Sequence, residues 1–245
     1  MTYLENLLKN GFIQLPNFYD KQLIDNVKQE IISKEKEIVD KIVDKIVDKT
    51  FNKFDYGIEN NSFKYLNHVN FWFRNINVLI NKPLFNILNS LINFDFYLDR
   101  IELHQKKPGT SITPPHQDNF YFGLDLKKNF SLTVYVALND QNEEMGSLGF
   151  YPGSNHKNFN HHQSNVVGFS SGIDVKDLKD EIPIIPKLKA GDVLIHHCNI
   201  VHFAKKNISN IPRMNIALRI MPTNPKNDNY LKKIYNEFKI KSKRI

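Results

Sequence analysis

The chain has 245 residues, of which 41% are hydrophobic and 12% aromatic, and its formal net charge is +7. This composition is typical of a folded globular domain and excludes a disordered chain. No uninterrupted apolar run approaches the ~20 residues that a membrane-spanning helix needs, so we expect no membrane span.

The cysteine content and the ends of the chain bear on compartment and partners. Cys198 is the only cysteine, so no intrachain disulfide can form, which favours a reducing compartment such as the cytoplasm. The first residues, MTYLENLLKNGF, lack a basic segment followed by an apolar run, so we expect no signal peptide. The stretch LKKIYNEFKIKSKRI is basic, which is typical of a solvated tail but also suits an anionic partner such as nucleic acid. No pattern indicates an oligomeric state.

Residues 1–95 are predicted to be a mainly helical flank. In residues 1–35, the turn-rich stretch NGFIQLPNF separates two helices and can form a short strand. Residues 38–49 repeat Ile-Val-Asp-Lys, which predicts a slipped repeat that extends a surface helix, with a partner-binding helix as the alternative. Residues 62–95 are predicted to be mostly helical, with breaks at asparagines.

From residue 96 onward, the pattern changes to short strands. Runs of β-branched and aromatic residues alternate with clusters of glycine, proline and asparagine, which is typical of strands joined by turns. The predicted strands are FYLDRIELHQKK, FSLTVYVALND, GSLGFYPGS, IPIIPKL, GDVLIHHC and RMNIALRIMP. Helices followed by many strands predict an α+β fold with a sandwich or barrel core. We expect one domain over residues 1–245, with the strand-rich core in 96–222 and a basic helix or tail in 223–245.

The stretch TPPHQDNFYF places an imidazole and a carboxylate two residues apart. If the strand is extended there, the side chains of His116 and Asp118 point to one face and can share a metal ion. Pro114 and Pro115 favour an extended backbone before them. A histidine and a carboxylate suit Fe(II), Mn or Zn, and non-haem iron oxygenases add a second histidine. Surface polarity in a loop is the alternative, and the three following aromatics either close over a substrate or form ordinary core.

A second histidine and an arginine lie far along the chain. His202 ends a short apolar run in GDVLIHHCNIVHFAKKNISNIPR, and Arg213 begins the strand RMNIALR. An iron oxygenase driven by 2-oxoglutarate needs a cation for the far carboxylate of the keto acid, and a bidentate guanidinium suits it best. A surface ion pair is the alternative for Arg213. His197 shares a strand face with Val193 and Ile195, so it either lines the site or lies in the core.

A series of motifs runs through the strand-rich region. In order, they are TPPHQDNFYF, SLTVYVALND, GSLGFYPGSNH, GDVLIHHCNIVH and NISNIPRMNIALR. This series resembles the phytanoyl-CoA dioxygenase family of Fe(II)- and 2-oxoglutarate-dependent oxygenases, whose pattern is H-Q-D, L-T-x-W-x-A-L, G-x-L-x-x-x-P-G-S-H and G-D-x-x-x-x-H, then a distal H, N-x-S and P-R. The resemblance covers residues 100–220, with a weaker likeness in GFIQLPNFYDKQLID.

The resemblance implies a double-stranded β-helix, a jelly-roll or cupin-like core, flanked by N-terminal helices. It implies that His116, Asp118 and His202 bind Fe(II). It also implies that Arg213 holds the far carboxylate of 2-oxoglutarate. Because the family's halogenases carry a small residue in place of the carboxylate, Asp118 implies a hydroxylase.

Further residues are implied to surround the co-substrate. Lys106, or its neighbour Lys107, matches a family lysine near 2-oxoglutarate. Tyr135 stands where the family often has tryptophan, and Gln117 is the central residue of the H-Q-D motif; we assign both to the co-substrate site. Ala204 stands where a serine is common, which implies the loss of one hydrogen bond to the co-substrate.

The implied activity is hydroxylation of an unactivated C–H bond of a small-molecule substrate, with consumption of dioxygen and release of succinate and carbon dioxide. A nucleic-acid or nucleotide oxygenase of the AlkB type is an alternative, because RMNIALR resembles R-x-N-x-T-x-R with Ala217 in the threonine place. The HQDN and PGSNH motifs favour the phytanoyl-CoA type. Two functions without oxygenase chemistry also fit: a binding module without activity, and a cupin-like metal protein such as a zinc-dependent isomerase.

Overall fold

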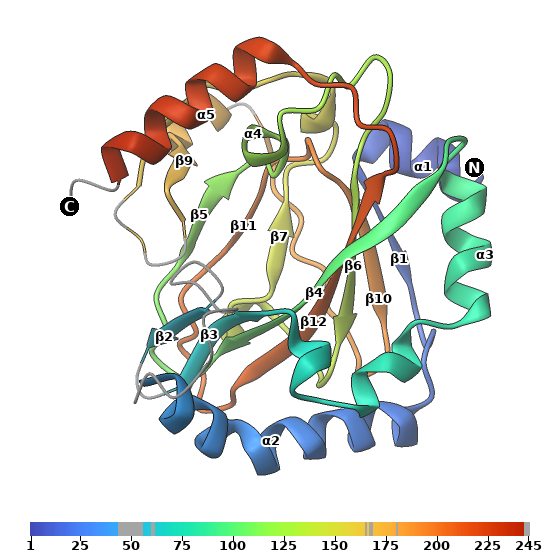
Figure 1. Ribbon diagram of the computed structural model, residues 1–245, viewed down its shortest axis with the longest axis vertical. Helices are drawn as coiled ribbons and strands as arrows, with labels where there is room; N and C mark the ends of the chain where they lie inside the picture. Colours follow the sequence, from blue (N-terminus) through green and yellow to red (C-terminus); the bar gives the residue numbers. More distant parts are fainter. Residues whose placement is uncertain (44–55, 60–61, 165, 167–168, 180, 243–245) are drawn as a thin grey trace.

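The core consists of two antiparallel sheets that face each other across a cavity, with helices around them (Figure 1). The computed structural model describes residues 1–43, 56–59, 62–164, 166, 169–179 and 181–242. The larger sheet has seven strands in the order β1-β10-β6-β12-β4-β3-β2. Their bounds are β1 (Phe12–Leu15), β2 (Tyr56–Glu59), β3 (Ser62–Asn67), β4 (Phe96–Lys106), β6 (Leu132–Ala137), β10 (Val193–His197) and β12 (Arg213–Pro222).

The smaller sheet has three strands in the order β5-β11-β7. They are β5 (Thr113–His116), β7 (Leu148–Phe150) and β11 (His202–Ala204). From β4 to β12 the chain goes back and forth between the two sheets, and Ile184 adds an isolated bridge to Phe150 at the edge of the smaller one. This path is that of a double-stranded β-helix, so the predicted fold is confirmed. A separate hairpin pairs β8 (His161–Gln163) with β9 (Ser171–Ile173).

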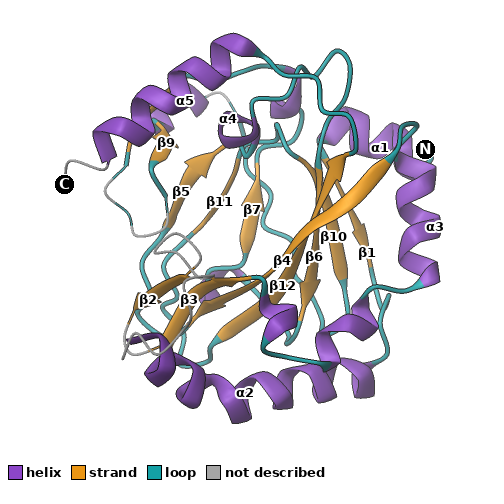
Figure 2. Cartoon of the chain, viewed as in Figure 1, coloured by secondary structure: helices purple, strands orange, loops and turns teal. Residues whose placement is uncertain are grey.

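Helices lie around the sheets (Figure 2). The α-helices are α1 (Tyr3–Asn10), α2 (Lys21–Val43), α3 (Lys82–Leu91), α4 (Asn119–Phe122) and α5 (Asn229–Ser242). In Figure 2, α2 runs along the bottom, α1 and α3 lie at the right, and α5 lies at the upper left. The 3₁₀ helices are η1 (Val69–Phe71), η2 (Asn75–Leu79), η3 (Glu143–Met145), η4 (Ser154–His156) and η5 (Val175–Leu178). Among the helices described, none combines the length and the apolar character needed to cross a membrane.

The side chains of β12 alternate between two environments. Met214, Ile216 and Leu218 are buried in one apolar core with residues of α2 and α3. Arg213 and Asn215 lie on the opposite face and line the cavity between the sheets. Successive side chains of a strand point to opposite faces, so one strand both anchors the helical flank and supplies the cavity.

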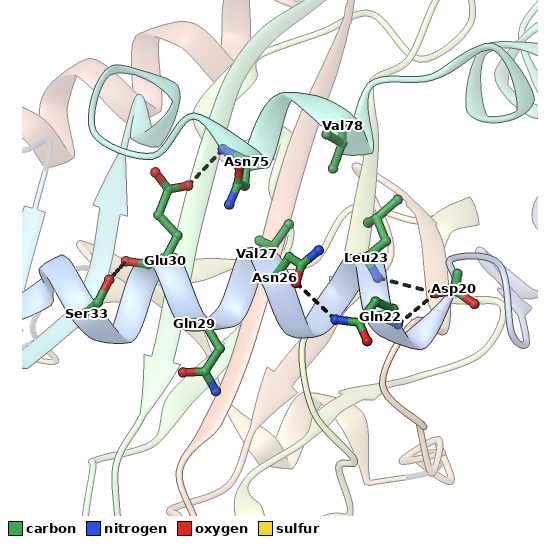
Figure 3. Close-up of a pocket in the computed structure, with 10 residues that line it drawn as sticks. All are labelled: Asp20, Gln22, Leu23, Asn26, Val27, Gln29, Glu30, Ser33, Asn75 and Val78. Atoms are coloured by element: carbon green, nitrogen blue, oxygen red, sulfur yellow. Dashed lines mark hydrogen bonds between the residues drawn. The ribbon is translucent and has the colours of Figure 1, made fainter.

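A surface groove separates α2 from η2 (Figure 3). Glu30 of α2 accepts hydrogen bonds from the backbone N–H groups of Arg74 and Asn75, at 3.1 and 2.8 Å. Lys34 lies one helical turn further on and pairs with the same carboxylate at 2.7 Å. The carboxylate therefore caps the start of η2 and connects it to α2, so Glu30 serves the packing of these two helices.

Two segments differ from the sequence-based predictions. Ser62–Asn67, predicted to be helical, forms β3, because pairing of Tyr65 with His104 of β4 overrides its local preference. IPIIPKL, predicted to be a strand, makes only isolated bridges at Ile184 and Leu188. Its two prolines lack the N–H groups that a continuous ladder needs.

The Ile-Val-Asp-Lys repeat begins inside α2. Ile38, Val39 and Ile42 are buried in the apolar core, while Lys41 is exposed and pairs with Glu37 at 2.6 Å. This part of the repeat thus belongs to the core and is not a purely surface extension. Residues 44–49 of the repeat lie outside the described residues.

We expect Ile216→Ala to lower the free energy of unfolding by about 2–5 kcal/mol, because it leaves a cavity in the centre of the packed core. Ile182→Ala, at a side chain that is 85% exposed, should change it by less than about 0.5 kcal/mol. Urea denaturation followed by circular dichroism measures both. Equal losses in the two variants would contradict the packing described for β12.

Candidate metal centre

Three buried side chains converge where β5, β11 and α4 meet. His116 ends β5 and His202 begins β11, and the two residues are direct partners across the antiparallel pair. Asp118 follows β5 by two positions. Each of the three is at most 5% exposed. The structure thus brings together the three residues that the sequence suggests as metal ligands.

The potential ligand atoms of the three residues lie within 4.8 Å of one another. Nε2 of His116 is 3.6 Å and Nε2 of His202 is 3.8 Å from Oδ1 of Asp118. On the other side of each ring, Nδ1 donates to a backbone carbonyl: that of Pro114 at 2.8 Å and that of Ile200 at 3.1 Å. These bonds leave both Nε2 lone pairs facing the carboxylate, which is the arrangement that metal-binding histidines need.

The ionisation of these groups suits a metal. Burial raises the pKa of Asp118, but the guanidinium of Arg219 and the two imidazoles outweigh it and hold the pKa well below its ordinary value. Burial lowers the pKa of His202 well below its ordinary value, and nearby His116 adds to this. An ionised carboxylate and a neutral imidazole are the forms that bind metals. Two imidazoles and one carboxylate fit Fe(II), Mn, Co or Zn.

The local conformation at Asp118 differs from the expected strand. Its φ and ψ are −58° and −32°, and it is the N-cap residue of α4, so the argument from one face of an extended strand is wrong there. Gln117 fixes the turn: its amide donates to the carbonyls of Lys157 and Asn199 at 2.8 and 2.6 Å. Its backbone N–H donates to Nε2 of His161 at 3.2 Å. The turn, and not the pleat of a strand, aims the carboxylate at the imidazoles.

One cavity extends from the three candidate ligands between the sheets. Its lining residues are His104, Thr113, His116, Thr133, Tyr135, Leu148, Phe169, His196, His202, Ala204, Arg213, Asn215, Ala217 and Arg219. Of these, only His104, Thr113, Phe169 and Arg219 are partly exposed. The cavity therefore has a buried floor and a rim that reaches solvent.

The floor carries polar atoms with unused hydrogen-bonding capacity. Nη1 of Arg213 donates to the hydroxyl of Tyr135 at 3.0 Å, and that hydroxyl donates to Oε1 of Gln141 at 2.5 Å. Nε of Arg213, Oδ1 of Asn215 and Nδ1 of His196 are buried and make no hydrogen bond within the described part of the chain. Unsatisfied buried polar groups are costly, so this floor is suited to a polar ligand.

Lys106 and Gln117 do not line the cavity. The ammonium of Lys106 donates to the carbonyls of Ser111 and Lys205, the latter at 2.9 Å. Burial, assisted by Arg213, lowers the pKa of Lys106 to about 7. The alternative, Lys107, lies 3.8 Å from the carboxylate of Glu35. Their assignment to the co-substrate remains a prediction.

Other residues near the site were left open or missed by the sequence analysis. His197 packs on the Phe130 ring at 4.8 Å and accepts the N–H of Asn199, on the face away from the cavity. His196 points into the cavity, as strand alternation with His197 requires. Arg219 also lines the cavity. Because it lies six residues after Arg213 on the same strand, the two side chains share a face, and this spacing could have indicated its position. Phe120 is buried against the ring of His161, as part of an aromatic core.

We expect His202→Ala to weaken Co(II) binding by more than about 100-fold, because it removes a ligand. His196→Ala should weaken Co(II) binding less than about 10-fold, the lower end of the effects of residues that contact metal ligands and not the metal. The rings of His196 and His202 nevertheless lie only 4.8 Å apart. Titration against a chromophoric chelator measures both affinities. The reverse ranking would mean that His196 is the ligand.

Comparison with known proteins yields matches over most of the chain. Residues 7–215 match the sequence profile described as phytanoyl-CoA dioxygenase (PhyH). Over 123 residues, the chain is 29% identical to phytanoyl-CoA dioxygenase 1 of Oryza sativa subsp. japonica. That stretch is 48% of this chain and 42% of the rice protein, so the match spans less than half of that relative.

Crystal structures share the fold at low sequence identity. The epimerase SnoN in complex with Fe³⁺, α-ketoglutarate and nogalamycin RO has a TM-score of 0.69 and 17% identity, over 94% of this chain and 87% of SnoN. EctD from S. alaskensis with 2-oxoglutarate and 5-hydroxyectoine has a TM-score of 0.69 and 15% identity, over 89% of this chain and 74% of EctD. These likenesses concern the fold alone. The profile match extends over most of the sequence, and the chain therefore belongs to the phytanoyl-CoA dioxygenase family.

Proposed function

We propose that the chain is an Fe(II)- and 2-oxoglutarate-dependent dioxygenase that hydroxylates an unactivated C–H bond of a small molecule. The observation that carries this proposal is the shared cavity: the His116, Asp118 and His202 cluster and the buried guanidinium of Arg213 line the same space. Such a cavity offers ligands for iron and a cation for a dianionic keto acid. With iron, 2-oxoglutarate and dioxygen bound, the chemistry supplied is oxidative decarboxylation to succinate and carbon dioxide, coupled to oxygenation of the substrate.

Arg213 is the residue proposed to bind the far carboxylate of 2-oxoglutarate. Its side chain is 5% exposed and its Nε donor has no partner within the described residues. Tyr135 holds the guanidinium through Nη1, which leaves other donors for a carboxylate. A charge-assisted, bidentate bond in a buried setting is strong and directional. Tyr135 is thus proposed to position Arg213, a task that needs its hydroxyl.

The rim of the cavity is proposed to admit the primary substrate. The partly exposed lining residues are His104, Thr113, Phe169 and Arg219, a mixture of polar and aromatic groups. The burial of the three candidate ligands and of Arg213 keeps bulk water away from the reacting atoms, which oxygenases need to avoid side reactions. The presence of 5-hydroxyectoine in EctD and of nogalamycin RO in SnoN supports a small organic substrate, and the lone, buried cysteine supports a cytoplasmic setting.

Competing functions make different predictions. A nucleic-acid substrate would bring strongly salt-dependent binding, because phosphate contacts release counterions. A cupin-like isomerase or a binding module would not consume 2-oxoglutarate. No feature of the described cavity favours any of these functions, so the dioxygenase remains the proposal.

We expect the iron-loaded protein to convert 2-oxoglutarate to succinate, and Arg213→Met to raise the Kd for 2-oxoglutarate by about 100-fold or more, since a bidentate charged pair is lost. Tyr135→Phe should raise it by about 5-fold, the equivalent of one hydrogen bond. Succinate assay and calorimetry on Mn(II)-loaded protein measure the two quantities.

Lys106→Met tests the predicted contact of Lys106 with the co-substrate against the hydrogen bonds that its buried amine donates to backbone carbonyls. It should leave the Kd within about 5-fold of wild type, less than one charged hydrogen bond is worth. A loss as large as that of Arg213→Met would place the carboxylate at Lys106. Absence of any succinate from iron-loaded wild type would contradict the proposed function.

A further inference from the structure

The two oxygens of Asp118 face different partners. Oδ1 faces the Nε2 atoms of His116 and His202, at 3.6 and 3.8 Å. Oδ2 faces away from them: it pairs with Nη1 of Arg219 and lies 3.5 Å from the hydroxyl of Thr133. Only Oδ1 is therefore turned toward the space between the imidazoles.

Arg219 is itself fixed in place by other buried groups. Its Nε donates to both carboxylate oxygens of Glu102, and its Nη2 lies near one of them, each at 3.2 Å. Its Nη1 also donates to Thr133 at 2.8 Å. Glu102 is 6% exposed and is held in turn by Nε2 of His104 at 3.0 Å. The guanidinium thus has little freedom to leave Asp118.

The charges of this arrangement leave one negative charge in excess, because one guanidinium pairs with two carboxylates. The positive guanidinium stands between two carboxylates, one at the candidate metal site and one behind it. Opposite charges that are largely shielded from water and hydrogen-bonded to each other are tolerated where a lone charge is not. Because Glu102 neutralises Arg219, the guanidinium can bond to Asp118 without adding a net positive charge beside a metal ion.

We propose that Arg219, anchored by Glu102, is a positioning residue that makes Asp118 a one-oxygen metal ligand and so preserves an open coordination position. The inference rests on the proposed function and deepens it. An octahedral ion that takes one atom from each of three residues keeps half of its positions open. A keto acid that chelates through two oxygens then leaves a single position for dioxygen. A carboxylate that used both oxygens would fill that position.

The number of waters on a bound Mn(II) ion tests this proposal, because Mn(II) accepts the same ligand set and exchanges its waters rapidly. Water-proton relaxation dispersion of the Mn(II)-loaded full chain should count about three bound waters in wild type, one for each open position. Arg219→Met frees Oδ2, so the count should fall to about two. If this variant fails to fold, Arg219→Gln is measured instead, because its amide keeps a hydrogen-bonding group beside Glu102, and the same count is expected.

Arg213→Met is the matched control. It removes the other arginine on the same face of β12, whose guanidinium bonds to Tyr135 and not to Asp118 within the described part of the chain. Its water count should equal that of wild type, while its affinity for 2-oxoglutarate falls. A merely structural role for Arg219 would change stability and leave the water count unchanged.

The outcomes separate this inference from the proposed function. About three waters in the Arg219 variant, or about two in wild type, would overturn the positioning role and leave the metal site intact. A drop in the Arg213 variant as well would attribute the effect to loss of charge in the cavity and would also overturn it. Failure of wild type to bind Mn(II) at all would contradict the metal site itself.

Discussion

The candidate metal centre depends on one pairing, that of β11 with β5, which sets His202 directly opposite His116. Opposite residues of an antiparallel pair share a face of the sheet, and here the two rings lie 4.2 Å apart between centroids. A slip of one residue would turn His202 to the other face. Pairing of β11 with β7, where Phe150 is the partner of His202, holds the register from the second side.

Strand β12 contributes both to the packed core and to the cavity. Its outward side chains, such as Ile216, are packed against the helices, and its inward ones include Arg213 and Arg219. Among the described residues, none of the side chains that line the cavity comes from α1, α2 or α3. The helical flank therefore acts on the site indirectly, by fixing the strand that carries both arginines. Protein interiors are densely packed and transmit strain. A substitution on the helical side of this strand is therefore expected to shift the side chains on its cavity side.

The sequence predicted those residues of the candidate site that belong to short local motifs. The H-Q-D motif, the distal histidine and the arginine after a proline are short signals in a fixed order, and His116, Asp118 and His202 do come together. Five of the six strands predicted from residue 96 onward, those that became β4, β6, β7, β10 and β12, also follow from their own β-branched and aromatic content. By contrast, the roles of Glu102 and Arg219 depend on which strands are neighbours, a property of tertiary pairing that no local pattern contains.

At two further places the observed conformation differs from the predicted one because of contacts with distant parts of the chain. Asp118 adopts a helical backbone because Gln117 bonds to the carbonyls of Lys157 and Asn199, groups that are far away in sequence. Ser62–Asn67 forms β3 because it pairs with β4 in antiparallel fashion. In both cases a distant partner outweighs local preference. The motif therefore indicated which candidate ligands come together, while the direction in which their atoms point depends on contacts with distant parts of the chain.

The central claim is that one cavity holds a metal and a keto acid together. Anaerobic titration of 2-oxoglutarate into the Fe(II)-loaded protein tests it most directly, with the visible charge-transfer band between the metal and the chelated keto acid as the signal. The account predicts a band that saturates at one keto acid per iron in wild type and is absent in Asp118→Ala. Iron binding without a band in wild type would contradict it.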